Sequence, residues 1–362
     1  MQDKCRTAAC PKDGSATGYH SVGKCEHPIE VSDKVTGVVH SVRCGSRLAA
    51  RCRSCSQIAK KDYQKIVSAG FGEVDTSQYC FFFLTLTAPS FGKTHTVVKT
   101  GQQPKKCRCG VMHNPQADAG VRGIPIDMDS YDYEGCCEWN YRLGKLWDSS
   151  RASLSANFPE ASFVKVVEYQ SRGALHTHCI VRIPKKESII SDSGARKILD
   201  VARSTVTRTG LTWGKQGDGK PIRQIAEQDK FIRYMAKMLT YVTKDSDVLR
   251  HEIPSQAAEH YSRLDWTARH MRCDKCRHME RPCLSLCHRR WGARSSVMSK
   301  SRQAKNHRAW SKVRRMDLKQ RRIEFAQEAG RLGVAIGILA EIVASKNLQP
   351  IKLKNLSLLH YH

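Results

Sequence analysis

Half of the cysteines in this sequence stand in closely spaced pairs, and this spacing restricts what the chain can fold into. The chain holds 16 cysteines in 362 residues. The pairs are Cys52/Cys55, Cys107/Cys109, Cys273/Cys276 and Cys283/Cys287. Such a pair supplies two thiolate ligands from one turn, which suits a tetrahedral zinc site, whereas disulfide scaffolds are typical of short secreted chains. We therefore expect reduced cysteines, structural Zn²⁺ and a cytoplasmic protein.

Basic residues strongly outnumber acidic ones. The 61 Lys and Arg residues against 34 Asp and Glu give a formal net charge of +27. An excess of this size favours a polyanionic partner, above all a nucleic acid. The longest apolar run, 332–344, contains Glu341 and falls short of the roughly 20 residues that a membrane-spanning helix needs. We expect no membrane association, and residues 1–14 show no secretory or transit signal.

The hydrophobic pattern predicts a mixture of strands and helices. Runs rich in apolar and β-branched residues predict strands at 81–87, 162–169 and 175–183. Apolar residues at helical spacing predict helices at 56–69, 138–157, 195–203, 226–244 and 322–344. A hairpin-like turn, 170–174, separates the last two predicted strands.

Two histidines on one predicted strand form the first candidate site. Because side chains alternate along a strand, His176 and His178 share a face, with Cα atoms about 6 to 7 Å apart, and can share one divalent ion. Glu168 lies across the predicted turn, where its carboxylate can come beside the imidazoles, and Gln170 is the alternative third ligand. Such a ligand set leaves positions open for a substrate oxygen.

The second candidate site lies on the predicted helix 226–244. Tyr234, Lys237 and Tyr241 fall along one helical face. A phenol has a pKa near 10, so a tyrosine that attacks at neutral pH needs a neighbouring cation or metal ion. Lys237 can provide that charge or neutralise a phosphate. The same pattern also fits aromatic residues that simply pack an amphipathic helix.

Three further groups of residues have the composition of zinc sites. Cys25, Cys44, Cys52 and Cys55 supply four thiolates, with His27 as an alternative ligand. A second group provides three ligands, Cys107, Cys109 and His113. The third group consists of Cys273, Cys276, Cys283 and Cys287, with His278 and His288 beside them.

Several of these segments, in this order, carry a resemblance to a known family. FLTLT at 83–87, EYQSRGALHTH at 168–178 and YMAK at 234–237 resemble the three motifs of rolling-circle replication initiators, a branch of the HUH endonucleases. CGSR at 44–47, CRSC at 52–55, CRCGVMH at 107–113 and YDY at 131–133 resemble, more narrowly, the RepSA-like plasmid initiators of actinobacteria. The resemblance extends over residues 25–302.

The residues and the resemblance together predict an α+β fold with three parts. These are a cysteine-rich zinc-binding module at 1–70, an HUH-like core at 76–250 and a Cys-rich, basic helical DNA-contacting region at 251–362. The core would be an antiparallel sheet flanked by helices, with a zinc-like insertion near 105–135. In the family a further cysteine pair completes the zinc cluster of this insertion. Because 127–130 lacks that pair, either Asp127 or Cys136 replaces it or the site is lost.

The resemblance also implies an activity: nicking and rejoining of single-stranded DNA at a plasmid origin through a 5′-phosphotyrosine, which starts rolling-circle replication. His176, His178 and Glu168 would hold Mg²⁺ or Mn²⁺, and Tyr234 would be the nucleophile. The family has a second tyrosine where this chain has Met238, so Tyr241 is the alternative nucleophile. The implied partners are single-stranded and origin DNA, a host helicase and a DNA polymerase.

Two alternative functions remain open at this point. One is a conjugative relaxase or single-strand transposase with the same core, and the other is a zinc-bearing DNA-binding regulator without catalysis. The segment 289–322 fits all of these, because it carries thirteen Lys or Arg residues against one acidic residue. Its cations can neutralise phosphates, and Trp291 and Trp310 can stack on unpaired bases.

Overall fold

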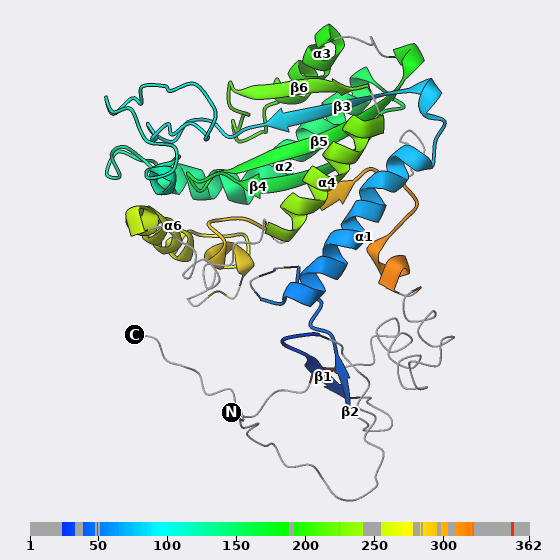
Figure 1. The fold of residues 1–362 in the computed structure, drawn as a ribbon, viewed down its shortest axis with the longest axis horizontal. Coiled ribbons are helices and arrows are strands. Elements are labelled where there is room, and N and C mark those ends of the chain that lie inside the picture. Colours follow the sequence, from blue (N-terminus) through cyan, green and yellow to red (C-terminus); the bar gives the residue numbers. More distant parts are fainter. Residues whose placement is uncertain are drawn as a thin grey trace, which may run out of the picture. The chain divides into compact units, whose positions relative to one another are not determined.

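The computed structural model divides the chain into two compact units (Figure 1), one formed by 1–44 with 316–362 and the other by 45–315. The residues that it describes are 24–32, 39–47, 49, 51–187, 192–223, 225–241, 255–277, 283, 285–294, 298–302, 309–319, 321 and 349–350. The predicted helix 322–344 lies outside these residues. Within the described residues, no helix is long and apolar enough to span a bilayer.

The smaller unit contains a three-stranded antiparallel sheet in the order β2-β1-β8. Its strands are β1 (Ile29–Ser32), β2 (Val39–Val42) and β8 (Gln349–Pro350). Just after β2, the backbone N–H of Cys44 donates a hydrogen bond to Sγ of Cys25 at 3.4 Å. Two of the four cysteines predicted for the first zinc site therefore lie together in this unit.

The larger unit is built on a five-stranded antiparallel sheet in the order β6-β3-β5-β4-β7. Its strands are β3 (Tyr79–Leu86), β4 (Ser162–Tyr169), β5 (Leu175–Pro184), β6 (Gly217–Ile222) and β7 (Met298–Lys300). The expected antiparallel sheet is confirmed, and β4 begins and ends where the sequence predicts. The two edge strands, β6 and β7, were not predicted.

Helices cover both faces of this sheet (Figure 1). α1 (Arg53–Gly72) and α4 (Ile225–Tyr241) lie on one side, and α2 (Tyr133–Asn157) and α3 (Asp192–Arg203) on the other. A further helix, α6 (Ala258–His270), packs against α2. Short 3₁₀ turns occupy Thr76–Gln78, Ala119–Val121, Lys185–Glu187, Ser255–Ala257 and Leu286–Arg289. The mixed α+β class is therefore confirmed.

The alternation of side chains along the strands decides which helix covers which face. On β3, Phe81 stacks on Phe71 of α1, with ring centroids 4.6 Å apart, and Phe83 stacks on Phe231 of α4 at 4.5 Å. α1 and α4 therefore cover the same face. On the opposite face, α2 packs against β4 and also contacts α3. The core lies in two layers, one on each side of the sheet.

The basic segment contributes to this core. Trp310 is fully buried and packs edge-on against Phe71 and Phe81, and its indole N–H donates to the Val67 carbonyl at 3.2 Å. A Cβ atom at Gly70 would lie 2.0 Å from the indole ring, so only glycine fits there. The expectation that Trp310 stacks on bases is therefore wrong, because its ring is already enclosed by α1 and β3.

Trp291 is also buried, with 2% of its surface exposed. Its ring lies parallel to that of Tyr261 at 5.0 Å. It is therefore not available for bases either. In the basic segment the described residues form β7 and irregular stretches, followed by a short helical stretch at 315–319, and the helical character expected for 251–362 as a whole stays a prediction. The predicted domain boundaries stay predictions, although β7 and Trp310 place part of 251–362 in the larger unit.

Candidate active site and metal centres

Three side chains of the β4–β5 hairpin converge on one face of the sheet. Glu168 lies directly opposite His176 in the strand register. Oε2 of Glu168 lies 3.2 Å from Nε2 of His176 and 3.6 Å from Nε2 of His178, and the two Nε2 atoms are 3.0 Å apart. The turn that sets this register is closed by a hydrogen bond from Gln170 N–H to the Ala174 carbonyl. All three ligand atoms can therefore reach one ion.

The charges of this cluster suit a divalent cation. Burial alone would raise the pKa of Glu168, but hydrogen bonds from His176 and His178 outweigh burial and lower that pKa to about 2. Burial lowers the pKa of His178 and so favours its neutral form. A carboxylate and two imidazoles form a ligand set of the kind that divalent ions occupy. Gln170, the alternative ligand, instead accepts a hydrogen bond from Arg172 at 2.8 Å.

Tyr234 of α4 lies beside this cluster. Its ring meets that of His178 edge-on, with centroids 5.3 Å apart, and 41% of the residue is exposed. Burial and the negative charge of Glu168 raise the pKa of the phenol. Lys237 is exposed one turn further along α4. The side chains of Met238 and Tyr241 lie outside the described residues.

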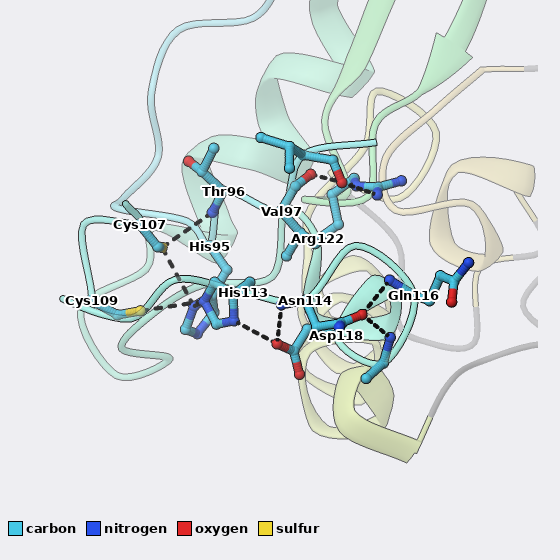
Figure 2. Close-up of polar contacts among 12 residues, drawn as sticks. His95, Thr96, Val97, Cys107, Cys109, His113, Asn114, Gln116, Asp118 and Arg122 are labelled. Atoms are coloured by element: carbon cyan, nitrogen blue, oxygen red, sulfur yellow. Dashed lines mark hydrogen bonds and ion pairs between the residues drawn. The ribbon is translucent and has the colours of Figure 1, made fainter. Parts of the chain in front are cut away.

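A second cluster lies in the long loop between β3 and α2 (Figure 2). Its members are His95, Cys107, Cys109 and His113. Nε2 of His113 lies 3.1 Å from Nδ1 of His95 and 3.3 Å from Sγ of Cys109. Nδ1 of His113 contacts Asp118 at 3.3 Å, as Figure 2 shows. Two thiolates and two imidazoles, with a carboxylate behind one of them, are typical of structural zinc.

His95 is the ligand that the sequence did not reveal. It lies twelve residues before Cys107 and outside any short motif, and backbone bonds to Gly123 and Ile124 hold it beside the others. The two replacements expected from the sequence lie elsewhere. Asp127 accepts a hydrogen bond from the Asp129 N–H at 3.0 Å, and Cys136 is buried in α2, with Sγ 4.0 Å from the Arg172 carbonyl. The fourth member of the cluster is therefore His95, and not Asp127 or Cys136 as expected.

A third cluster brings together Cys273, Cys276, Cys283 and His288. The structure thus puts His288 in the place expected for Cys287, which is buried and donates to Ser285 Oγ at 3.3 Å. His278 lies outside the described residues.

The remaining cysteine set is divided between the two units. Cys25 and Cys44 belong to one unit, and Cys52 and Cys55, at the start of α1, belong to the other. Their joint role in a zinc site stays a prediction.

Comparison with known proteins agrees with the motifs. The model of the RepSA family, described as "Replication initiator protein, pSAM2", matches residues 14–349. The chain therefore belongs to this family of replication initiators, as its motifs predict. A curated replication initiator protein of Streptomyces ambofaciens is 29% identical, over 58% of this chain and 57% of its own length. The chain thus spans a little over half of that relative, and no solved structure matches.

Proposed function

We propose that this chain nicks and rejoins single-stranded DNA at a plasmid origin and so starts rolling-circle replication. The observation that carries the proposal is the position of Tyr234, half-exposed and edge-on to His178, beside three potential metal ligands. Family membership supports a role in replication, and the net charge of +27 supports a DNA partner. The reaction would take place in the cytoplasm, where a plasmid lies.

In this proposal Tyr234 attacks the scissile phosphate. A bond forms between the phenolate oxygen and phosphorus while the bond from phosphorus to the 3′ oxygen breaks. The phenol proton passes to solvent, and the leaving 3′ oxygen takes up a proton. The products are a 5′-phosphotyrosine and a free 3′ hydroxyl, which a host polymerase can extend after a helicase has separated the strands. Because the tyrosyl ester retains the energy of the phosphodiester, a 3′ hydroxyl can later attack it and rejoin the DNA without ATP.

Glu168, His176 and His178 would hold Mg²⁺ or Mn²⁺, which when bound supplies Lewis-acid stabilisation of the phosphate charge. Positive charge is needed here, since burial and Glu168 raise the pKa of Tyr234 and so disfavour the phenolate. Lys237, three residues further along α4, is the chain's own candidate to favour the phenolate or to neutralise the phosphate.

Zn²⁺ would have a separate, structural role in the loop cluster of His95, Cys107, Cys109 and His113. Its closed tetrahedral ligand set leaves no position for a substrate. The four cysteines at 25, 44, 52 and 55 are proposed as a further zinc site.

The test mixes purified protein, Mn²⁺ and single-stranded DNA from the region around its own gene, followed by a denaturing gel. We expect a covalent protein–DNA band that is absent in Tyr234→Phe and His176→Ala and present in Tyr241→Phe. Tyr234→Phe should keep its DNA affinity, because only the attacking oxygen is removed.

Three other outcomes would contradict parts of the proposal. A band that survives Tyr234→Phe and disappears in Tyr241→Phe would move the nucleophile to Tyr241. Bound DNA without a covalent band under any condition would favour the non-catalytic regulator. Failure of the surrounding DNA to sustain a plasmid together with this gene, despite nicking, would favour a relaxase or transposase.

A further inference from the structure

The cluster at Cys273, Cys276, Cys283 and His288 has the geometry of a built metal site. Its four ligand atoms lie within 4.8 Å of one another. Sγ of Cys273 is 3.6 Å from Sγ of Cys276 and 3.8 Å from Sγ of Cys283, and Nε2 of His288 is 3.5 Å from Sγ of Cys276. Three sulfurs and one nitrogen at such distances suit tetrahedral Zn²⁺.

The hydrogen bonds of His288 decide which of its nitrogens can bind a metal. Nδ1 lies 2.9 Å from the carbonyl oxygen of Ala268 in α6, and a carbonyl can only accept. Nδ1 therefore carries the hydrogen, which leaves the lone pair on Nε2, the atom that faces the thiols. A backbone carbonyl is one of the usual partners of the second ring nitrogen of a histidine that binds zinc. Cys287 packs in the same buried cluster as Cys273 and Cys276, but its thiol donates to Ser285 and is not one of the four ligand atoms that lie close together.

The chain that leaves His288 runs to the turn between β4 and β5. Three residues after His288, the backbone carbonyl of Trp291 accepts a hydrogen bond from Nδ2 of Asn140 at 2.7 Å. The indole N–H of Trp291 donates to Asp265 of α6 at 2.7 Å. The same Nδ2 atom donates to the Gly173 carbonyl at 2.9 Å, and Oδ1 of Asn140 accepts from the Leu175 N–H at 2.8 Å. Buried Asn140 thus connects the Trp291 segment to both sides of the turn.

α6 also contacts this turn directly. A Cβ atom at Gly173 would lie 2.3 Å from a methyl group of Leu264, so α6 packs against the backbone itself. Gly173 has a φ of +81°, which only glycine adopts readily. The turn lies between Glu168 on β4 and His176 on β5, so its position sets the alignment of these two side chains.

We propose that Cys273, Cys276, Cys283 and His288 bind one Zn²⁺ ion, and that this ion positions the turn that aligns Glu168 with His176. The zinc ties His288 to Cys273 and Cys276 at the end of α6, and so fixes Trp291, Asn140 and the turn. His288 is a positioning residue in this scheme, because its side chain is buried and acts through the turn. The zinc assignment does not depend on the proposed function, whereas a role of this ion in catalysis does.

The first experiment measures zinc per chain in the full-length protein by atomic emission. His288→Ala and Cys276→Ser should each lose one zinc ion per chain relative to the parent. Cys287→Ser is the matched control and should lose none, and His288→Cys should keep the zinc by completing a four-sulfur site. Loss of zinc in Cys287→Ser, or full zinc content in His288→Ala, would overturn the assignment.

If Cys276→Ser proves insoluble, cadmium-113 NMR of the parent protein loaded with cadmium identifies the metal ligands instead. A site with three sulfurs and one nitrogen should give a resonance that moves to the four-sulfur range in His288→Cys and stays in place in Cys287→Ser. A resonance that moves only in Cys287→Ser would overturn the ligand set.

The positioning role is read from hydrogen exchange at the Leu175 amide. Exchange there should be faster in His288→Ala and return to the parent rate in His288→Cys, whereas amides in the middle of β3 should exchange at the parent rate in all variants. Unchanged exchange at Leu175 after zinc loss would refute the positioning role. If these results hold but no covalent DNA adduct ever forms, the proposed function fails while the zinc site stands.

Discussion

The hydroxyl of Thr85 lies 3.1 Å from Nδ1 of His178, across the paired strands β3 and β5. Thr85 and His178 face each other directly in the strand register. Because Thr85 contacts Nδ1 of His178, the other ring nitrogen, Nε2, faces Glu168 and His176. The first strand of the core thus orients a ligand that belongs to another strand.

This contact predicts that Thr85→Val weakens Mn²⁺ binding. Loss of a second partner of a histidine ligand typically lowers metal affinity by about 10- to 100-fold, because the ring is no longer held in one orientation. Calorimetric titration with Mn²⁺ measures the change. The control is Thr87→Val, which removes a hydroxyl that donates to the Gln216 carbonyl and should leave Mn²⁺ affinity at the parent value. Equal affinities in Thr85→Val and the parent would show that the hydroxyl does not orient His178.

The loop cluster predicts that His95 is needed for zinc binding. His95→Ala should lose one zinc ion per chain, because three ligands hold zinc far less tightly than a complete tetrahedral set. Cys136→Ser and Asp127→Ala should keep the full zinc content, since both residues lie outside the cluster. Metal analysis of the purified variants decides between the two ligand sets, and zinc loss in Asp127→Ala would contradict the account.

Buried His260 predicts a loss of stability in acid. Its Nδ1 lies 3.1 Å from the Tyr133 hydroxyl, and burial lowers its pKa to about 4. Between about pH 6.5 and pH 4 the unfolded chain takes up a proton that the folded chain does not. The free energy of unfolding therefore decreases as the pH is lowered through this range, by up to about 3 kcal/mol.

Urea unfolding at several pH values measures this effect. His260→Asn should show a weaker pH dependence than the parent across that window. His270→Asn, on the exposed part of α6, controls for the substitution itself. Identical pH dependence in His260→Asn and the parent would count against the role of His260.

The position of Trp310 predicts that its removal affects stability and not base stacking. Trp310→Ala should lower the free energy of unfolding by about 3 to 5 kcal/mol, because it leaves a cavity between α1 and β3. Trp266→Ala, at a residue that is 62% exposed, should change it by less than about 0.5 kcal/mol. Thermal unfolding gives the stabilities. Weaker DNA binding by folded Trp310→Ala of unchanged stability would restore the stacking hypothesis.

Local patterns were enough to predict the central strands and the hairpin. The run of apolar residues at 162–169 and the turn residues after it predict β4 and its partner, and the alternation rule places His176 and His178 on one face. The edge strand β6 was missed because Gly217–Ile222 contains two glycines and a proline, so pairing with β3 overrides its low strand propensity.

The remaining errors concern contacts between segments distant in the sequence. His95 joins the loop cluster only because the chain closes on itself near Gly123, which residue spacing does not reveal. His288 and Cys287 are adjacent in the sequence, and only their contacts, His288 with Cys276 and Ala268 and Cys287 with Ser285, distinguish the proposed ligand from its neighbour. Trp310 lies among basic residues, and its burial depends on Gly70, 240 residues earlier.

The most direct test of the account identifies the tyrosine that carries the DNA. The covalent product formed with Mn²⁺ is treated with nuclease and trypsin, and the modified peptide is sequenced by mass spectrometry. Trypsin cuts after Arg233 and Lys237, so the two candidate tyrosines fall on different peptides, 234–237 and 238–244. We predict a nucleotide on Tyr234. A nucleotide on Tyr241, or on neither peptide, would contradict it.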